Sequence, residues 1–116
     1  MKVAASLEAK FTELGLKVNV ADFQDIVYIS ISDALEKPIA YQGLNTVSQY
    51  MFGALVEETW RRKGLGTLLK QCCEDIARQK GMKKLISATH PNNIPMQNLM
   101  EKMGYKRMIQ YSKDIP

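Results

Sequence analysis

The chain has 116 residues, of which 46% are hydrophobic and 24% charged, with a formal net charge of +4. A chain of this length supports one hydrophobic core, so we expect a single domain over residues 1–116. The composition excludes a disordered protein and a membrane-embedded one, and no apolar run approaches the roughly 20 residues of a spanning helix. Because the N-terminus also lacks a signal-peptide pattern, we expect a cytoplasmic protein with no membrane partner.

The positive charge is unevenly distributed along the sequence. Residues 1–60 hold four lysines and eight acidic residues, whereas residues 61–84 hold eight basic and two acidic residues. The second segment therefore suits a polyanionic ligand, either coenzyme A or nucleic acid. Nucleic acid is the less favoured of the two, because no aromatic residues alternate with these charges to stack on bases. A solvated helix face remains the alternative for Arg78, Lys80, Lys83 and Lys84.

The first half of the chain predicts one helix followed by three strands. Apolar residues at helical spacing predict a short helix over 2–14, ended by Gly15. Alternation predicts a strand over Ile26–Ser32, and a turn at Asp33–Pro38 joins it to a second strand over Ile39–Leu44. The third strand, over Ser48–Val56, is continuously apolar and is expected to be covered on both faces, with Gly53 marking a bulge or a close backbone approach.

Two glycines then separate this strand from an amphipathic helix. Such a junction leaves the first N–H groups of the helix without intrahelical partners, and the helix dipole adds partial positive charge there. Gly64 and Gly66 allow the backbone to approach a ligand, and Arg61, Arg62 and Lys63 add charge. We interpret the loop as a pyrophosphate cradle. It is neither a dinucleotide fingerprint nor a P-loop, because both need residues that are missing after Gly66.

The second half predicts a helix, a strand, a second helix and a last strand. The apolar face of the first helix is formed by Leu65, Leu68, Leu69, Cys72, Cys73, Ile76 and Ala77, and its polar face by Lys70, Gln71, Glu74, Asp75, Arg78 and Gln79. Leu85–Thr89 should be a short buried strand parallel to the one before the loop. Asn93 is a plausible N-cap of the next helix, Gly104 its end, and Tyr105–Tyr111 a final alternating strand.

The two cysteines predict neither a disulfide nor a metal site. Cys72 and Cys73 are adjacent in sequence, so a disulfide between them would be strained. A metal site would need further ligands, which are missing nearby. We expect both to be small apolar residues on a helix face.

The loop resembles the signature of the GNAT superfamily of acetyl-CoA-dependent N-acetyltransferases. The signature Gln/Arg-x-x-Gly-x-Gly/Ala matches Arg61, Gly64 and Gly66, with Trp60 in a usual tyrosine place and Arg62 in a usual glycine place. A second family motif falls in register at Asn93, Met96, Leu99, Met100, Glu101, Lys102, Gly104 and Tyr105. The resemblance covers residues 48–106. It implies an α/β fold with a GNAT-like mixed, mostly antiparallel sheet, flanked by helices and shortened at its N-terminus.

The resemblance also implies a cosubstrate, acetyl-CoA, and where it binds. N–H groups from Arg62 to Thr67 would hold the pyrophosphate. In the family the strands before and after the central helix splay apart, and the pantetheine arm bonds to backbone at the place of Leu55 and Val56. Asn93 either contacts the pantetheine or only caps its helix. The implied cofactor-binding residues are Leu55, Val56, Arg61, Arg62, Lys63, Gly64, Leu65, Gly66, Thr67 and Asn93.

The catalytic groups are not assigned by the sequence. Met100 occupies the place where the family often has a tyrosine that protonates the leaving thiolate, and methionine has no proton to donate. Candidates for a general base are Glu57, Glu58, Tyr50 and His90.

The resemblance also implies a shortened acceptor side. Family members usually begin with a strand and two helices before the hairpin, and the loop between those helices lines the acceptor site, whereas here only one predicted helix precedes the first predicted strand. A partner subunit, as in a homodimer, could complete this side, or a large acceptor such as a protein could occupy it. The leading hypothesis is an N-acetyltransferase acting on a primary amine of a small molecule or protein. The alternatives are a non-catalytic acyl-CoA-binding module and, less favoured, a nucleic-acid-binding domain.

Overall fold

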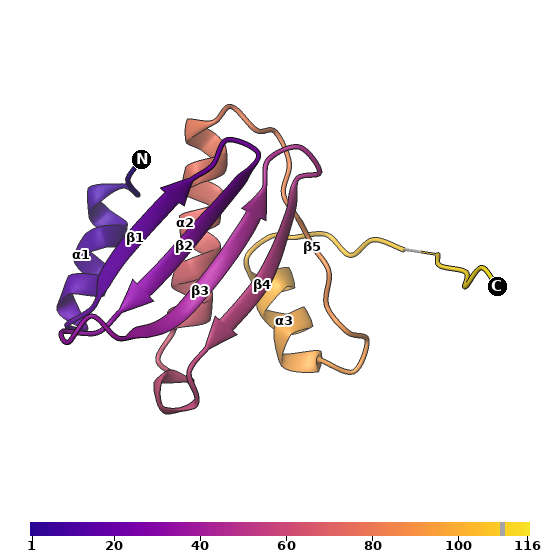
Figure 1. Cartoon of the computed structure of the whole chain (residues 1–116). Helices are drawn as coiled ribbons and strands as arrows, with labels where there is room; N and C mark the ends of the chain where they lie inside the picture. Colours follow the sequence, from indigo (N-terminus) through magenta and orange to yellow (C-terminus); the bar gives the residue numbers. More distant parts are fainter. Residues whose placement is uncertain (110) are drawn as a thin grey trace.

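A five-stranded mixed sheet with helices against it forms the structure, a computed structural model that describes residues 1–109 and 111–116 (Figure 1). In chain order the elements are α1 (Ala5–Glu13), β1 (Lys17–Asp22), β2 (Ile26–Ser32), β3 (Pro38–Asn45), β4 (Tyr50–Val56), the 3-10 turn η1 (Glu58–Trp60), α2 (Leu65–Gln79), β5 (Ile86–Ser87) and α3 (Ile94–Lys102). The strands lie in sequence order; β1 to β4 are antiparallel, and β5 is parallel to β4. The predicted mixed, mostly antiparallel sheet is confirmed.

The first strand, β1, was not predicted from the sequence. It pairs along its whole length with β2, from Lys17 opposite Ser32 to Asp22 opposite Val27. Its only apolar alternation is Val18 and Val20, which are half-buried against the core, and so short a pattern gives a weak signal. Only residues 23–25 connect β1 to β2, so no helix lies between these two strands.

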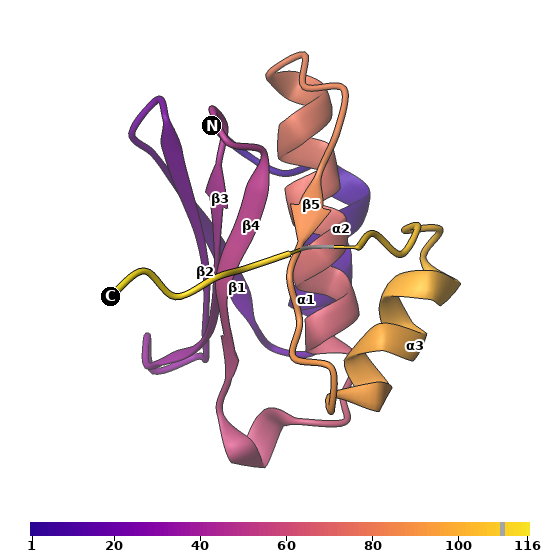
Figure 2. The same ribbon diagram turned by 90° about the vertical axis from the view of Figure 1, so that its right-hand side faces the viewer.

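The three α-helices lie against one face of the sheet (Figure 2). Their apolar residues meet the inward side chains of the central strands in one core, which includes Phe11, Ile29, Leu44, Leu69 and Ile76, all at most 1% exposed. The predictions of α1 and α2 are confirmed. Cys72 and Cys73 are buried and unpaired on the core side of α2, as predicted. None of the described helices is long and apolar enough to cross a bilayer.

None of the described helices covers the opposite face of the sheet, and this corrects the prediction for β4. Phe52 is 37% and Leu55 50% exposed, so the strand is not buried on both faces. The ring of Phe52 lies over Gly43, where an added Cβ would come within 2.5 Å of it, and edge-on to Tyr28 at 5.8 Å between centroids. Within the apolar run of β4, Met51 belongs to the core, whereas Phe52 and Leu55 belong to an open sheet face rather than to a second core.

The C-terminal elements agree only in part with the sequence. The parallel pairing of β5 is confirmed, but the strand contains only Ile86 and Ser87, and both are half-buried rather than buried. Asn93 caps α3, as predicted. The predicted strand Tyr105–Tyr111 is wrong for residues 105–109 and 111, which have no strand structure, while Gln110 lies outside the described residues. An alternating pattern forms a strand only when it pairs with another strand, and the described residues of this segment pair with none.

Candidate functional site

The loop between β4 and α2 is folded back against the end of β4. Arg61 Nε donates a hydrogen bond to the carbonyl oxygen of Val56 at 3.0 Å. Lys63 Nζ lies 4.7 Å from the centroid of the Trp60 ring, a cation–π contact, and Trp60 packs against the core. These contacts tie the loop to the end of β4 and to Trp60, and Arg62 and Lys63 are exposed to solvent.

The N-terminus of α2 presents a row of unpaired backbone donors. The first helical bond runs from the N–H of Leu68 to the carbonyl oxygen of Gly64 at 3.1 Å. The N–H groups of residues 62–67 find no acceptor in the part of the chain that the structure describes, and no side chain caps this helix. At α3, by contrast, Asn93 Oδ1 accepts from the N–H of Met96. The first turn of α2 contains no acidic residue, so this row favours an anion.

The two glycines leave space at these donors. Gly64 has φ +81°, a left-handed conformation that favours glycine, and serves as the N-cap of α2. A Cβ added at Gly66 would meet no heavy atom within 4 Å. Arg62, in the place where the family often has glycine, has φ +64°. Space, unpaired donors and positive charge together fit a phosphate-bearing group.

The end of β4 has one free edge next to this cradle. Val56 and Leu55 pair with Ala40 and Tyr41 of β3. On the other side β4 pairs with β5 only through Tyr50 and Met51, and the two strands separate beyond that point (Figure 1). The described strands therefore leave the β5-side edge of residues 52–56 unpaired, beside the start of α2.

The remaining candidate residues lie around this region in different roles. Asn93 is a helix cap, and His90 Nδ1 accepts from the N–H of Asn92 at 3.1 Å, so His90 orders the exposed loop before α3. Glu57 Oε1 contacts Lys37 Nζ at 3.4 Å and Thr59 Oγ1 at 3.2 Å. Glu58 is exposed at the start of η1.

Two further residues of the predicted site face different environments. Tyr50 is half-buried on β4, opposite Ile86 of β5. Met100 is 8% exposed and belongs to the hydrophobic core. A core methionine cannot take over the proton transfer of the tyrosine that the family often has here.

The positive charge is less concentrated at the loop than its place in the sequence indicates. Of the eight basic residues in 61–84, only Arg61, Arg62 and Lys63 adjoin the cradle. Lys80 forms an ion pair with Asp22. Arg78, Lys83 and Lys84 are exposed beyond or near the far end of α2, a helix of 15 residues and so about 22 Å long. All three are solvent-exposed away from the cradle, but only Arg78 lies on the helix itself, so the predicted solvated helix face holds for Arg78 alone.

Lys70 was predicted on the polar face of α2 and is instead 3% exposed. It lies at helical spacing with Cys73 and Ala77, which are also buried on α2. Its Nζ donates to Gln42 Oε1 at 2.5 Å, and burial lowers the pKa of this ammonium group. Its spacing with Cys73 and Ala77 is the signal that could have placed Lys70 toward the sheet, although lysine is seldom fully buried.

Fold and loop together define the class of the protein: a mixed α/β sheet with a phosphate cradle between β4 and α2. The chain belongs to the acetyltransferase (GNAT) family, whose model matches residues 5–105. This confirms the family resemblance, and acetyl-CoA is the family's cosubstrate. No protein of curated function matches the chain.

Solved structures share this fold at low sequence identity. An acetyltransferase from Trypanosoma brucei superposes with a TM-score of 0.67 at 17% identity, over 86% of this chain and 99% of its own. The aminoglycoside N-acetyltransferase AAC(6')-Iy in complex with CoA superposes with a TM-score of 0.62 at 20% identity, over 79% of this chain and 78% of its own. The aminoglycoside antibiotic 6'-N-acetyltransferase AAC(6')-Ih from Acinetobacter baumannii superposes with a TM-score of 0.60 at 17% identity, over 82% of this chain and 74% of its own.

Proposed function

We propose that the protein transfers acetyl from acetyl-CoA to a primary amine by direct attack. The observation that carries this proposal is the row of unpaired N–H groups at residues 62–67, at the start of α2 and beside three basic side chains. These donors would bind the pyrophosphate of coenzyme A, with the positive end of the helix dipole behind them. The aminoglycoside acetyltransferases of the same fold support an amine as the acceptor.

The free edge of β4 is the proposed place for the pantetheine arm and the thioester. Pantetheine carries two amide groups, which can pair with an unsatisfied strand edge as a further strand does. The backbone N–H groups near Leu55 and Val56 would then stabilise the negative charge that develops on the thioester oxygen. Acetyl-CoA supplies the activated acetyl group.

The reaction needs no covalent enzyme intermediate. The neutral amine nitrogen forms a bond to the thioester carbon, the carbon–sulfur bond breaks, and coenzyme A leaves as a thiolate. The extra proton on nitrogen passes to solvent or to a base, and the thiolate takes a proton from solvent, since Met100 provides none. We assign no general base, because His90 orders a loop and Glu57 contacts Lys37.

A second candidate function is an acyl-CoA-binding module without turnover. The buried Met100 favours it, because the residue that often acts as acid in the family is replaced by a core side chain. This function predicts that acetyl-CoA binds and that no acetyl group is transferred.

Thiol release from acetyl-CoA in the presence of small primary amines and lysine peptides distinguishes the two functions. The acetyltransferase proposal predicts thiol release that depends on a primary amine and a matching acetylated product by mass spectrometry. A tertiary amine, which cannot form a stable amide, is the matched control. Binding of acetyl-CoA with no acetylated product across the panel would support the second candidate and contradict the first.

A further inference from the structure

Lys70 is a buried lysine that takes part in no ion pair within residues 1–109 and 111–116. Its side chain leaves α2 toward the sheet, and its Nζ bonds the side-chain oxygen of Gln42 on β3. Burying an ammonium group is costly unless it is both paired with an opposite charge and hydrogen-bonded. A buried lysine with only an amide partner therefore points to a role beyond filling the core.

Gln42 also forms hydrogen bonds with backbone, and one of them reaches β4. The residue is 1% exposed, and its Nε2 donates to the carbonyl oxygen of Phe52 at 2.7 Å and to that of Gly43 at 3.2 Å. Lys70 and Gln42 thus form a continuous chain of hydrogen bonds from the cradle helix, through β3, to the backbone of β4. Lys70 lies one turn after Gly66, so the chain begins directly behind the cradle.

The chain ends at a bulge in β4. Tyr41 pairs with Leu55 and Gly43 with Phe52, so two residues of β4, Gly53 and Ala54, lie opposite the single residue Gln42. A bulge interrupts the ladder of backbone hydrogen bonds. The Gln42 amide supplies a donor to a carbonyl at the edge of this interruption. Gly53 has φ +64°, which glycine adopts without strain.

We propose that Lys70 and Gln42 are positioning residues for the thioester site, because they hold the β4 bulge in a fixed relation to the cradle helix. The bulge sets the direction in which the backbone N–H and C=O groups of Leu55 and Val56 point. A shift of the strand register by one residue would turn every side chain beyond it to the opposite face of the sheet. The inference rests on the proposed function, which places the pantetheine arm at this edge. In this proposal Lys70 and Gln42 contact neither the phosphates nor the thioester. They align the two parts of the cofactor site, the cradle and the edge of β4.

Two probes separate this role from a purely structural one. Acetyl-CoA contacts both the cradle and the β4 edge, whereas 3′-phosphoadenosine 5′-diphosphate is coenzyme A without pantetheine and contacts the cradle alone. We expect Lys70→Met and Gln42→Leu to weaken acetyl-CoA binding by about threefold to tenfold, the value of one net hydrogen bond. Binding of the fragment should stay within about twofold of wild type, since the N–H groups of the cradle are untouched.

The variant Gln42→Glu tests the positioning role even if Lys70→Met and Gln42→Leu fail to fold. Its carboxylate retains the contact with Lys70 and adds an ion pair, but it has no proton to donate to the carbonyl of Phe52. We therefore expect a folded variant that has lost acetyl-CoA affinity selectively. Lys83→Met, an exposed lysine beyond the other end of α2, is the matched control and should change neither affinity.

The outcomes are distinguishable from a failure of the proposed function. If wild type binds neither probe, the acetyl-CoA proposal itself is wrong. If wild type binds acetyl-CoA more tightly than the fragment and Gln42→Glu keeps that difference, the positioning role is overturned. Equal losses for both probes in Gln42→Glu would also overturn it, because they would show a general disturbance of the fold.

Discussion

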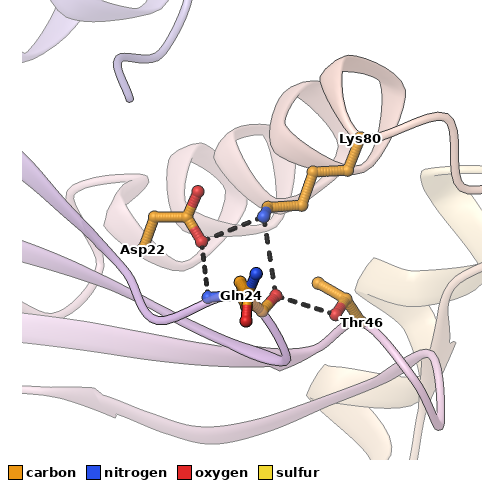
Figure 3. A network of polar contacts seen from close by, with 4 residues as sticks. All are labelled: Asp22, Gln24, Thr46 and Lys80. Atoms are coloured by element: carbon orange, nitrogen blue, oxygen red, sulfur yellow. Dashed lines mark hydrogen bonds and ion pairs between the residues drawn. The ribbon is translucent and has the colours of Figure 1, made fainter.

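Lys80 Nζ lies 2.9 Å from Asp22 Oδ1, and this ion pair joins the end of α2 to the end of β1 (Figure 3). The same carboxylate oxygen accepts from the N–H of Gln24 at 2.9 Å, and Thr46 Oγ1 donates to the Gln24 carbonyl at 3.0 Å. Gln24 has φ +71°. The network therefore fastens the short β1–β2 turn, and the turn after β3, to the helix that carries the cradle.

The first prediction concerns the acid stability that this network provides. The Lys80 ammonium, and then the N–H of Gln24, lower the pKa of Asp22 below its ordinary value of 3.8. A carboxylate with a lowered folded pKa stabilises the fold above pH 3.8, and this stability is lost as the pH falls through the folded pKa. We expect Asp22→Asn to unfold more easily than wild type in urea at pH 7, and to lose less stability than wild type on acidification below pH 4.

The control for this prediction is the more exposed pair of Lys37 and Glu57. Its nitrogen–oxygen distance is 3.4 Å, and the Lys37 side chain is 63% exposed, so solvent screens it. Lys37→Met should change the unfolding free energy less than Lys80→Met does. Equal stability of Asp22→Asn and wild type at pH 7 would contradict the assigned role of the network.

The second prediction concerns Arg62, whose φ of +64° is left-handed. A residue with a Cβ is strained there by about 1 kcal/mol or more. We expect Arg62→Gly to raise the unfolding free energy by about 0.5–1 kcal/mol, because glycine relieves this strain but has more conformational freedom in the unfolded chain. The measurement is urea unfolding followed by circular dichroism.

Arg62→Ala separates strain from charge, because alanine removes the guanidinium and keeps the Cβ. It should give no stabilisation. Both variants should weaken acetyl-CoA binding to a similar extent through the lost charge. A gain in stability from alanine as large as that from glycine would show that repulsion among the basic residues, rather than backbone strain, destabilises the loop.

The third prediction decides between the two roles left open for Asn93. Its Oδ1 accepts from the N–H of Met96 at 3.2 Å, which identifies it as a cap. We expect Asn93→Ala to lower the unfolding free energy by about 1 kcal/mol and to leave acetyl-CoA affinity unchanged. Asn93→Ser should restore the stability, since serine caps equally well. A variant with restored stability but much weaker acetyl-CoA binding would instead place Asn93 in contact with pantetheine.

The fourth prediction concerns the cysteines, and it also bears on the thiol-release assay. Burial raises the pKa of Cys72 and of Cys73 to about 12, so the thiolate is scarce at pH 8. We expect a disulfide reagent such as DTNB to react slowly with the native protein and fully, at two thiols per chain, in guanidinium chloride. Rapid reaction of the native protein would show that α2 opens readily.

Helical spacing was the most informative sequence signal. It predicted α1, α2 and α3 and their glycine or asparagine ends, because amphipathic spacing and caps are local properties. β1 was missed because its strand character depends on pairing with β2, which the sequence of β1 does not encode. The prediction of a strand over 105–111 was wrong because a local pattern does not guarantee a partner. The described residues of this segment have the alternating pattern but pair with no other strand.

The candidate site likewise contains residues that a local motif predicts and residues that meet only in the folded structure. The cradle of Gly64, Gly66 and the adjacent basic residues is contiguous in sequence, so a local motif predicts it. Lys70 and Gln42 are 28 positions apart and meet only when α2 packs on β3. No spacing rule connects them, and the helical pattern placed Lys70 on the polar face of α2, as expected of a residue type that is seldom fully buried.

The central claim is that the start of α2 binds the pyrophosphate of acetyl-CoA, and calorimetric titration of acetyl-CoA into wild type and Gly66→Asp tests it most directly. Aspartate in the first turn suits the helix dipole, so the variant should keep the thermal stability of wild type while placing bulk and negative charge in the cradle. The account predicts saturable binding to wild type and none to Gly66→Asp. No binding to wild type at millimolar acetyl-CoA, or equal binding to both, would contradict it.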